Sequence, residues 1–279
     1  MGEKISRRRF FDYLLRIGIC VGFGYPIVIE PNWLAIERVD VPISDLPSGL
    51  DGLKIGLIAD LHRGRFVSEG DISKAVHVLQ NLSPDIIMLG GDFVKGKAKY
   101  IDSCAKILSK LKAPMGVYAV LGNHEYWTDP TLITSSLQKQ KIKVLINESV
   151  KLTWQGSHFY LVGLDDAWEG EPQPRKALKG TSDDIVKILL VHEPDYADRI
   201  KNVDSWIPLQ LSGHSHGGQV SLPFTGPLYY PYLAEKYPMG LNRISGLDRW
   251  VYTTRGIGIT VPLRFNCRPE ISILTLRSA

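Results

Sequence analysis

The sequence predicts an α/β protein in which two β-sheets form a sandwich flanked by helices. Apolar runs alternate with stretches of helical spacing in the first half of the chain, which favours parallel strands joined by helices. In the second half, apolar runs follow one another with few helical stretches between them, which favours a second sheet packed against the first. The 279 residues are enough for one large domain with a sizeable core.

The first half of the chain predicts strands and helices in alternation. Ile72, Val76 and Leu79 recur at helical spacing, and short apolar runs flank the stretch that contains them. The predicted strands are 53–59, 85–89 and 116–121, and the predicted helices are 68–82, 102–111 and 130–138. Strands connected through helices in this way lie parallel in one sheet.

The second half of the chain predicts mainly strands. Its apolar runs are short and are separated by turn-forming residues. These predicted strands are 144–146, 150–154, 159–164, 185–191, 209–211, 250–254 and 271–276. We assign them to the second sheet of the sandwich, because no long helix is expected between them.

The composition is that of an ordinary globular protein. Apolar residues make up 44% of the chain, charged residues 22%, and the net charge is +4. There is no basic face with interleaved aromatic residues, so no nucleic-acid binding is expected. The cysteines Cys20, Cys104 and Cys267 are too few and too widely spaced for a disulfide framework, and we expect Cys104 and Cys267 to be buried. No obligate protein partner is indicated.

Residues 1–45 differ from the rest, and we place the folded domain at residues 46–279. Arg7–Arg9 precede an apolar run from Phe10 to Ile29, a pattern that resembles a twin-arginine export signal. Arg16 interrupts this run and leaves it short of the ~20 apolar residues that span a bilayer. The alternatives are a segment that lies on a membrane surface and ordinary N-terminal structure. A linker ahead of the domain is indicated by Pro31, Pro42 and Pro47.

Polar side chains follow the apolar runs at the points where the predicted strands end. Because parallel strands direct their carboxyl ends to one crevice, we expect these side chains to meet. Two aspartates, four histidines and one asparagine oxygen form a suitable ligand set for a hydrolytic centre with two divalent metal ions. The predicted metal ligands are Asp60, His62, Asp92, Asn123, His192, His214 and His216.

Taken singly, most of these motifs have a simpler interpretation. Gly91-Asp92 and Gly122-Asn123 are typical of turns, and an isolated histidine such as His192 is more often a core residue. Asp92 is nevertheless suited to bridge two ions, because each of its carboxylate oxygens can bind one. The combination favours the metal centre, since every motif ends an apolar strand.

The order of the motifs resembles that of the calcineurin-like metallophosphoesterases. That family carries Asp-x-His, Gly-Asp, Gly-Asn-His-Glu/Asp, a single His and Gly-His-x-His in this order, and the match runs from about Lys54 to the end of the chain. The resemblance implies a fold of two sheets flanked by helices. It also implies that His124 faces the substrate as a catalytic side chain, with Glu125 orienting it. The implied ligands are Asp60, His62, Asp92 and His216 for one ion, and Asp92, Asn123, His192 and His214 for the second.

One motif departs from the protein phosphatases of this superfamily, which extend the second block to Gly-Asp-x-x-Asp-Arg-Gly. Residues 91–96 lack the second Asp and the Arg, so a protein-phosphatase role is not expected. The chain is closer to a bacterial membrane-linked phosphodiesterase branch, some of whose members cleave the pyrophosphate of UDP-2,3-diacylglucosamine in lipid A synthesis. The segments that carry this resemblance are 7–10, 192–195, 217–219, 254–256 and 266–270.

We therefore predict a phosphohydrolase that cleaves phosphodiester or pyrophosphate bonds, with a hydroxide shared by two ions as the nucleophile. Manganese is the expected metal, and iron and zinc are alternatives. Arg63 and Arg255 are candidate clamps for the substrate phosphate, although a solvated surface charge is the simpler interpretation of Arg63. The alternative functions are a phosphomonoesterase for a soluble substrate and a non-catalytic metal-binding scaffold.

The expected partner is a phosphate-containing small molecule or lipid, close to a membrane surface. The aromatic segment 224–237 is either a lip for an acyl chain or membrane, or a loop whose rings pack on the core. The N-terminal pattern predicts association with a bacterial inner membrane. The periplasmic face follows from a twin-arginine signal, and the cytoplasmic face follows from a role in lipid A synthesis.

Overall fold

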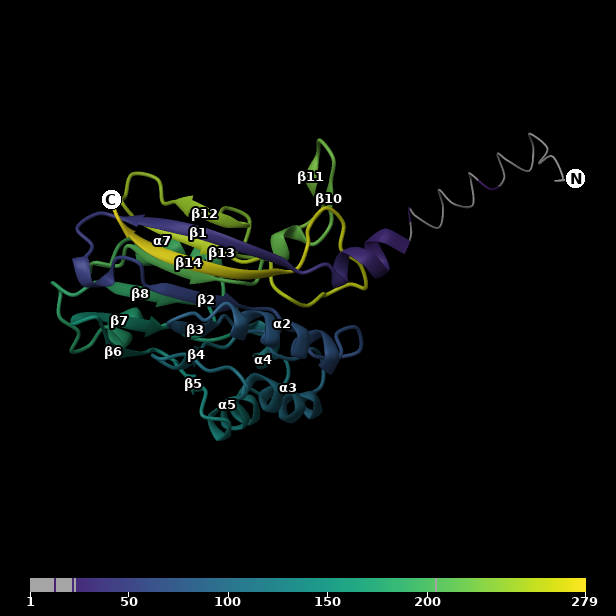
Figure 1. The fold of residues 1–279 in the computed structure, drawn as a ribbon, viewed down its shortest axis with the longest axis horizontal. Helices are drawn as coiled ribbons and strands as arrows, with labels where there is room; N and C mark the ends of the chain where they lie inside the picture. The colour runs from purple at the N-terminus through teal and green to yellow at the C-terminus, as the bar shows by residue number, and fades with distance from the viewer. Residues whose placement is uncertain (1–12, 14–21, 23, 204) are drawn as a thin grey trace, which may run out of the picture.

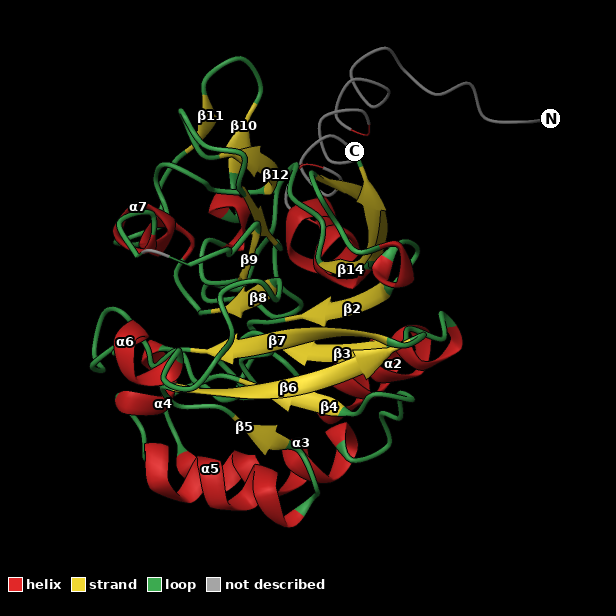
Figure 2. Ribbon diagram, turned by 90° about the vertical axis from the view of Figure 1, so that its left-hand side faces the viewer, coloured by secondary structure: helices red, strands yellow, loops and turns green. Residues whose placement is uncertain are grey.

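Two six-stranded sheets lie face to face and enclose an apolar core (Figures 1 and 2). The computed structural model describes Tyr13, Gly22, residues 24–203 and residues 205–279. Within these residues the predicted α/β architecture of two sheets flanked by helices is confirmed. The predicted export-signal motif at Arg7–Arg9 lies outside the described residues. None of the described helices has both the length and the apolar character needed to span a membrane.

The first sheet takes its strands from both ends of the chain. Its order is β1-β14-β2-β3-β4-β5; β2 to β5 run parallel, and β14 is antiparallel to β2 but parallel to β1. These strands are β1 Ala35–Ile43, β2 Lys54–Ile58, β3 Ile86–Leu89, β4 Val117–Ala119, β5 Lys143–Val144 and β14 Glu270–Ser278. The assignment of the runs 144–146 and 271–276 to the second sheet was therefore wrong, because β5 pairs with β4 and β14 pairs with β1 and β2. β3 is buried throughout, which explains its purely apolar sequence.

The second sheet has a parallel centre and an antiparallel strand at each edge. Its order is β12-β13-β9-β8-β7-β6. These strands are β6 Glu148–Trp154, β7 Ser157–Gly163, β8 Lys187–Leu190, β9 Leu209–Ser212, β12 Gly240–Arg243 and β13 Trp250–Thr253. A separate hairpin consists of β10 Ser221–Leu222 and β11 Gly226–Pro227.

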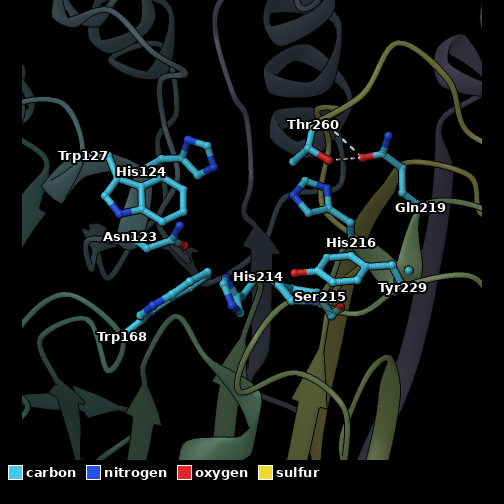
Figure 3. Close-up of a pocket in the computed structure, with 12 residues that line it drawn as sticks. Asn123, His124, Trp127, Trp168, His214, Ser215, His216, Gln219, Tyr229 and Thr260 are labelled. Carbon is cyan, nitrogen blue, oxygen red and sulfur yellow. Dashed lines mark hydrogen bonds between the residues drawn. The ribbon is translucent and has the colours of Figure 1, made fainter.

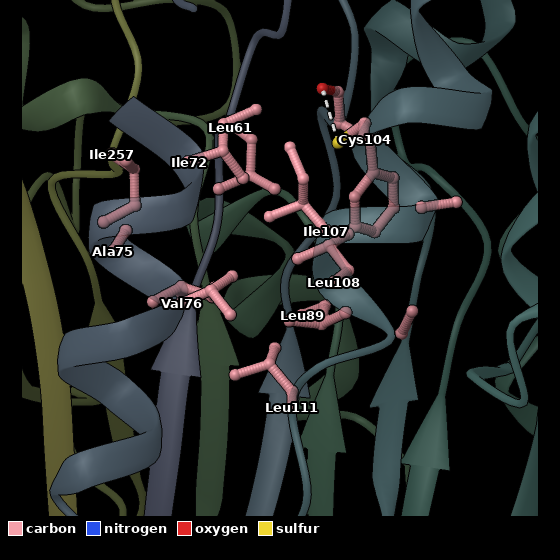
Figure 4. Packing of buried hydrophobic residues seen from close by; sticks show 14 of the residues in the cluster. Leu61, Ile72, Ala75, Val76, Leu89, Cys104, Ile107, Leu108, Leu111 and Ile257 are labelled. Carbon is pink, nitrogen blue, oxygen red and sulfur yellow. Dashed lines mark hydrogen bonds between the residues drawn. The ribbon is translucent and has the colours of Figure 1, made fainter. Parts of the chain in front are cut away.

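Three helices cover the outer face of the first sheet (Figure 2). They are α2 Glu69–Asn81, α3 Ile101–Leu108 and α5 Pro130–Lys139. A capping box formed by Ser68 and Asp71 starts α2, and the apolar stripe that its spacing predicted is buried. Leu89, Leu108 and the predicted buried Cys104 belong to the same apolar layer between helices and sheet (Figure 4).

The remaining helical segments are short, and two of them, α4 and η6, carry residues of the predicted metal site. The short α-helices are α4 Asn123–Tyr126, α6 Pro174–Ala177 and α7 Ala197–Ile200. A π-helical turn, η1, spans Tyr25–Ile29. The 3-10 turns are η2 Glu30–Asn32, η3 Ser48–Leu50, η4 Ala98–Tyr100, η5 Pro194–Tyr196 and η6 His216–Gly218.

Four of the described strands were not expected from the sequence: β1, the short β10 and β11, and β12. β1 lies within residues 1–45, which we placed outside the domain, and it pairs with β14 from Ala35 opposite Glu270 to Ile43 opposite Ser278. Pro42 indicated a linker, but β1 is an edge strand, and an edge tolerates a residue without a backbone N–H. The first sheet therefore begins ahead of residue 46.

Candidate metal centre

The predicted ligands lie where strands of both sheets end. Asp60 and His62 follow β2, Asp92 follows β3, Asn123 opens α4 after β4, His192 follows β8, and His214 and His216 follow β9. Backbone hydrogen bonds tie the loops together. The N–H of Asp60 donates to the carbonyl oxygen of Gly91 at 2.9 Å, and the N–H of Gly213 donates to that of His192 at 3.0 Å. The loops thus continue the pairing of the strands and bring the side chains to one place.

The ligand atoms form two groups. Nε2 of His62 lies 2.9 Å from Nε2 of His216, which lies 3.4 Å from Oδ1 of Asp60. Oδ2 of Asp92 lies 3.5 Å from Nε2 of His62 and 3.3 Å from Nε2 of His192. Asp92 therefore stands between the groups, as a ligand shared by two ions would. Three groups have ligand atoms within 4.8 Å of one another: Asp60-His62-His216, Asp92-His192-His214, and His62-Asp92-His124, which includes the predicted catalytic histidine.

Most of these residues adopt the left-handed backbone conformation. The φ angle is 54° at Asp60, 47° at His62, 56° at Asp92, 69° at His214 and 51° at His216. This conformation costs a non-glycine residue on the order of 1–3 kcal/mol, and such residues cluster at functional sites. The cross-linked loops therefore hold five side chains in a strained arrangement that points them toward one another.

Two glycines allow the close approach of these loops. A Cβ at Gly213 would lie 2.5 Å from Oδ2 of Asp60, and a Cβ at Gly91 would lie 2.8 Å from Nδ1 of His192. The φ of Gly91 is also positive, at 94°. Any larger residue at either position would displace a predicted ligand.

Hydrogen bonds orient two of the histidines. Nδ1–H of His192 donates to the carbonyl oxygen of Gly90 at 2.6 Å, and Nε2–H of His214 donates to that of Tyr232 at 2.8 Å. In the neutral ring of each, the other nitrogen carries the lone pair that a metal ion would bind. Nε2 of His192 and Oδ1 of Asn123 are buried without a hydrogen-bond partner among the described residues. Because buried acceptors need a partner, these nitrogen and oxygen donors fit divalent metal ions.

The electrostatics of the centre also favour cations. Burial raises the pKa of Asp60 to about 7 and lowers that of His214 to about 3. Burial also disfavours the charged form of His192, but the neighbouring carboxylates Asp92 and Asp60 outweigh it and raise the pKa of His192 well above its usual range. The buried carboxylates thus create a negative field that bound cations would neutralise.

Glu125 has a different position from the one its predicted role requires. Its buried carboxylate accepts the backbone N–H groups of Asp92 at 2.7 Å, Phe93 at 2.9 Å and Gly122 at 2.9 Å. Among the described residues, no hydrogen bond joins it to the ring of His124. Glu125 therefore fixes the loop that carries Asp92, instead of orienting the catalytic histidine directly.

Both arginines predicted to clamp phosphate are engaged by protein groups. Arg63 donates to the carbonyl oxygen of Gly64 at 2.7 Å, and its guanidinium pairs with the exposed Glu69 at 3.4 Å. Arg255 forms ion pairs with Glu37 at 2.5 Å and with the buried Glu270 at 2.8 Å. A phosphate would have to displace these partners, so the geometry disfavours the predicted clamp role.

A third arginine, which the sequence reasoning missed, lies beneath the centre. Arg264 is fully buried and donates to several backbone carbonyl oxygens, including that of Gly258 at 2.7 Å. Its positive charge favours the ionised form of Asp60. The buried Cys267 of the same loop donates its Sγ–H to the carbonyl oxygen of His216 at 3.1 Å. This loop therefore supports ligands from both sheets.

His124 faces a cavity of about 190 Å³ beside the ligands (Figure 3). Its ring centroid lies 4.5 Å from that of His62, and its backbone N–H donates to Oδ1 of Asp92 at 3.0 Å. A phosphate group in this cavity would lie between His124 and the ligand side chains. The aromatic residues that line the cavity are Trp127, Trp168 and Tyr229.

Comparisons with known proteins agree with this geometry. The sequence profile of the calcineurin-like phosphoesterases matches residues 53–218. The uncharacterized metallophosphoesterase YkuE of Bacillus subtilis is 34% identical over 99% of this chain and 99% of its own length. The phosphodiesterase YaeI of Escherichia coli is 34% identical over 98% of this chain and 99% of its own. The UDP-2,3-diacylglucosamine pyrophosphatase LpxG of Chlamydia muridarum is 27% identical over 88% of this chain and 90% of its own.

The fold and the clustered histidines and aspartates define a metal-dependent phosphoesterase. The profile covers more than half of the residues, and relatives in two bacteria match over nearly the whole length. The chain belongs to the calcineurin-like phosphoesterase family. The family and the class of enzyme predicted from the sequence are thereby confirmed.

Proposed function

We propose that this enzyme cleaves phosphodiester or pyrophosphate bonds with two divalent metal ions. The observation that carries the proposal is the pair of ligand groups on either side of Asp92, next to a cavity that His124 faces. Two relatives, a phosphodiesterase and a pyrophosphatase, support diesters and anhydrides as substrates. A phosphomonoesterase is the alternative. A non-catalytic scaffold is less well supported, because His124 and a complete ligand set are present.

The side chains have distinct roles in this proposal. When bound, the ions supply positive charge to the phosphoryl oxygens and lower the pKa of a water molecule that becomes the nucleophile. His124 stands on the cavity side of the ligands, where its ring can hold a proton for the leaving oxygen. The proposed ligands are Asp60, His62, Asp92 and His216 for one ion, and Asp92, Asn123, His192 and His214 for the other.

Manganese is our proposal for the metal, with iron and zinc as alternatives, because the donors are nitrogen and oxygen atoms without a thiolate. The test is to remove metal with a chelator, reload the protein with each ion, and measure metal content and turnover. We expect about two ions per chain and faster hydrolysis of bis(p-nitrophenyl) phosphate than of p-nitrophenyl phosphate. Hydrolysis of the monoester alone would establish the alternative function.

We further propose that the substrate is linked to a lipid and that the enzyme works at a membrane surface. The β10–β11 hairpin projects from the domain (Figure 1), with Phe224 fully exposed at its tip and Leu228 64% exposed just after it. Tyr229, which follows, is 69% exposed and lines the cavity of His124. Tyr237 of the same aromatic segment is buried, so only part of the segment is available as a lip. Clustered exposed apolar groups of this kind suit a membrane interface.

A second apolar surface lies near the hairpin. Residues 27–29 of η1 expose aliphatic side chains, from 49% to 61% of their surface. Phe265 connects the two surfaces: it forms a β-bridge with Val220 below the hairpin, and its ring packs edge-on against that of Tyr25 at 6.5 Å. The apolar run that begins at Phe10 continues into this surface. The hairpin and η1 together would therefore face one bilayer, which we propose is a bacterial inner membrane. The enzyme would lie on the periplasmic face if a twin-arginine signal is used, and on the cytoplasmic face otherwise.

Vesicle binding tests the membrane proposal. The double variant Phe224→Glu, Leu228→Glu should sediment less with vesicles of phosphatidylethanolamine and phosphatidylglycerol than the unmodified chain. It should hydrolyse bis(p-nitrophenyl) phosphate at an unchanged rate but lose activity on UDP-2,3-diacylglucosamine. Leu132→Glu is the control, because Leu132 is 38% exposed on α5, outside the hairpin. Equal vesicle binding by all three proteins would refute the proposed surface.

A further inference from the structure

Two indole rings form a wall of the cavity directly beside His124. Trp127 directly follows α4, and its ring centroid lies 4.7 Å from that of His124 with an angle of 63° between the planes. Trp168, from the loop between β7 and α6, meets Trp127 at 5.2 Å and 80°. Figure 3 shows both indoles on one side of the cavity, with Tyr229 on the other. We call Trp127 and Trp168 the indole wall.

The indole wall is held in place by carboxylates behind it. Asp166 accepts the backbone N–H of Trp168 at 3.1 Å and that of Glu169 at 2.6 Å, and Glu193 accepts that of Ala167 at 2.9 Å. Asp166 and Glu193 are fully buried. Two further rings, of Tyr232 and His214, pack on Trp168 at 5.8 and 5.7 Å. The position of Trp168 is therefore fixed before any ligand binds, which lowers the entropic cost of binding.

The indole wall has unused binding capacity. Trp127 is 51% exposed, although it lies next to a buried polar centre. Within residues 24–203 and 205–279, the indole N–H of neither Trp127 nor Trp168 forms a hydrogen bond. A large apolar face with available N–H donors is suited to a flat ligand that has both a π-face and polar edges.

The position of the wall determines which part of a substrate it meets. His124 is proposed to act on the leaving oxygen, so the group attached to that oxygen lies against Trp127. The cavity of about 190 Å³ is smaller than the roughly 300–1,000 Å³ of pockets that enclose a whole drug-sized ligand. It therefore has room for the phosphoryl group and one adjoining moiety, while the rest of a larger substrate remains outside.

We propose that the indole wall is a subsite for a planar ring on the leaving group of the substrate, either a nucleobase or an aryl group. The ring stacks against an indole, and a nucleobase would also accept a hydrogen bond from an indole N–H through a carbonyl oxygen or ring nitrogen. This inference rests on the proposed phosphohydrolase function and adds a substrate class to it: phosphoesters or anhydrides whose leaving group carries a planar ring. Trp127 and Trp168 act here as specificity-determining residues.

Binding of matched ligands tests the subsite without turnover. Isothermal titration of the Mn²⁺-loaded protein would compare uridine 5′-monophosphate with ribose 5-phosphate, which has the same phosphate and sugar but no base. We expect tighter binding of the nucleotide. In Trp127→Ala and in Trp168→Ala, nucleotide binding should weaken about tenfold, the usual scale of base stacking on an aromatic side chain, while ribose 5-phosphate binding and metal content stay unchanged. Phenyl phosphate separates the two sources of the ring: stronger binding than the nucleotide assigns an aryl group, and weaker binding a nucleobase.

Trp33→Ala is the matched control, because Trp33 is 52% exposed and lies outside the cavity. It should leave all three affinities unchanged. Equal affinities of the unmodified protein for ligands with and without a ring would overturn the proposal, as would an equal loss for both ligands in the wall variants. A protein without metal or hydrolytic activity would instead count against the proposed function, and metal analysis distinguishes that result.

Discussion

Nε2 of His62 lies 2.9 Å from Nε2 of His216, although 154 residues separate the two histidines in the chain. His62 follows a strand of the first sheet and His216 a strand of the second, so this contact joins the two sheets. Nδ1 of each ring is buried without a hydrogen-bond partner among the described residues. Two imidazole nitrogens at this distance share one proton, whereas a divalent cation accepts both lone pairs.

Metal removal should therefore destabilise the protein. A ligand at 100 times its dissociation constant stabilises the folded state by about 2.7 kcal/mol per site, which corresponds to a shift of roughly 5–10 °C in Tm for a chain of this size. Scanning fluorimetry of chelator-treated protein, before and after addition of Mn²⁺, measures the shift. An unchanged Tm after reloading would contradict a metal centre that links the sheets.

Asp92→Asn should lose both metal and activity. The substitution removes a charge from the residue that stands between the two ligand groups and leaves a weaker ligand in its place. Elemental analysis and hydrolysis of bis(p-nitrophenyl) phosphate give the two readouts. Asp183→Asn is the matched control, because Asp183 is exposed and lies outside the metal centre. Normal metal content in Asp92→Asn would refute the shared-ligand assignment.

His124→Asn should keep its metal ions but lose turnover by a factor of about 10²–10⁴, the usual contribution of a general acid. A nitrogen of His124 lies within 4.8 Å of ligand atoms of His62 and Asp92, so metal content must be measured together with kcat. If metal content falls in parallel with kcat, His124 is a ligand and not the proton donor that we propose.

Glu125→Gln should weaken metal binding more than it lowers turnover. The amide of Gln presents one oxygen acceptor and one NH₂ donor, so a backbone N–H of the Asp92 loop loses its partner. We expect a loss of about 1–3 kcal/mol in unfolding free energy. We also expect metal affinity to weaken about 10–100-fold, the usual effect of substituting a residue that supports metal ligands. At saturating Mn²⁺, kcat should stay within about tenfold of the unmodified enzyme. A loss on the scale of a missing general acid, 10² or more, would restore the role predicted from the sequence.

Arg264→Met should destabilise the protein by about 2–4 kcal/mol, because several buried carbonyl oxygens lose their donor. Urea unfolding of the metal-free protein measures this change. Arg243→Met is the control, because Arg243 pairs with Asp248 on the surface with its side chain 61% exposed, and exposed pairs contribute about 0–1 kcal/mol. Similar midpoints for the two variants would show that the guanidinium of Arg264 has no supporting role.

Much of this fold could be predicted from the period of apolar residues. The helical spacing of residues 72–79 and the apolar run of β3 each depend on local burial, and both elements lie within a few residues of the prediction. β1 could not be found in this way. It is an edge strand with a mixed burial pattern, and Pro42 obscured it.

The candidate site, like the fold, could be predicted only where a local sequence pattern marks it. Predicted ligands such as Asp92 could be recognised because each of them follows an apolar strand. The supporting contacts depend on distant parts of the chain, and no local pattern distinguishes the buried Arg264 from the paired Arg255. In the same way, the sequence of the aromatic segment did not reveal that Tyr237 is buried while Phe224 is exposed. Sequence patterns thus indicated the chemistry, and tertiary packing decided which neighbours support it.

The position of β14 between β1 and β2 has a consequence for biogenesis. Translation proceeds from the N-terminus at about 5–20 residues per second, so β2, which pairs with β3 on one side, lacks its neighbour on the other side until residues 270–278 have left the ribosome. A nascent chain can form the helices and the inner strands earlier, but it cannot close its first sheet. All seven proposed ligands are therefore synthesised before the strand that completes the sheet beneath Asp60.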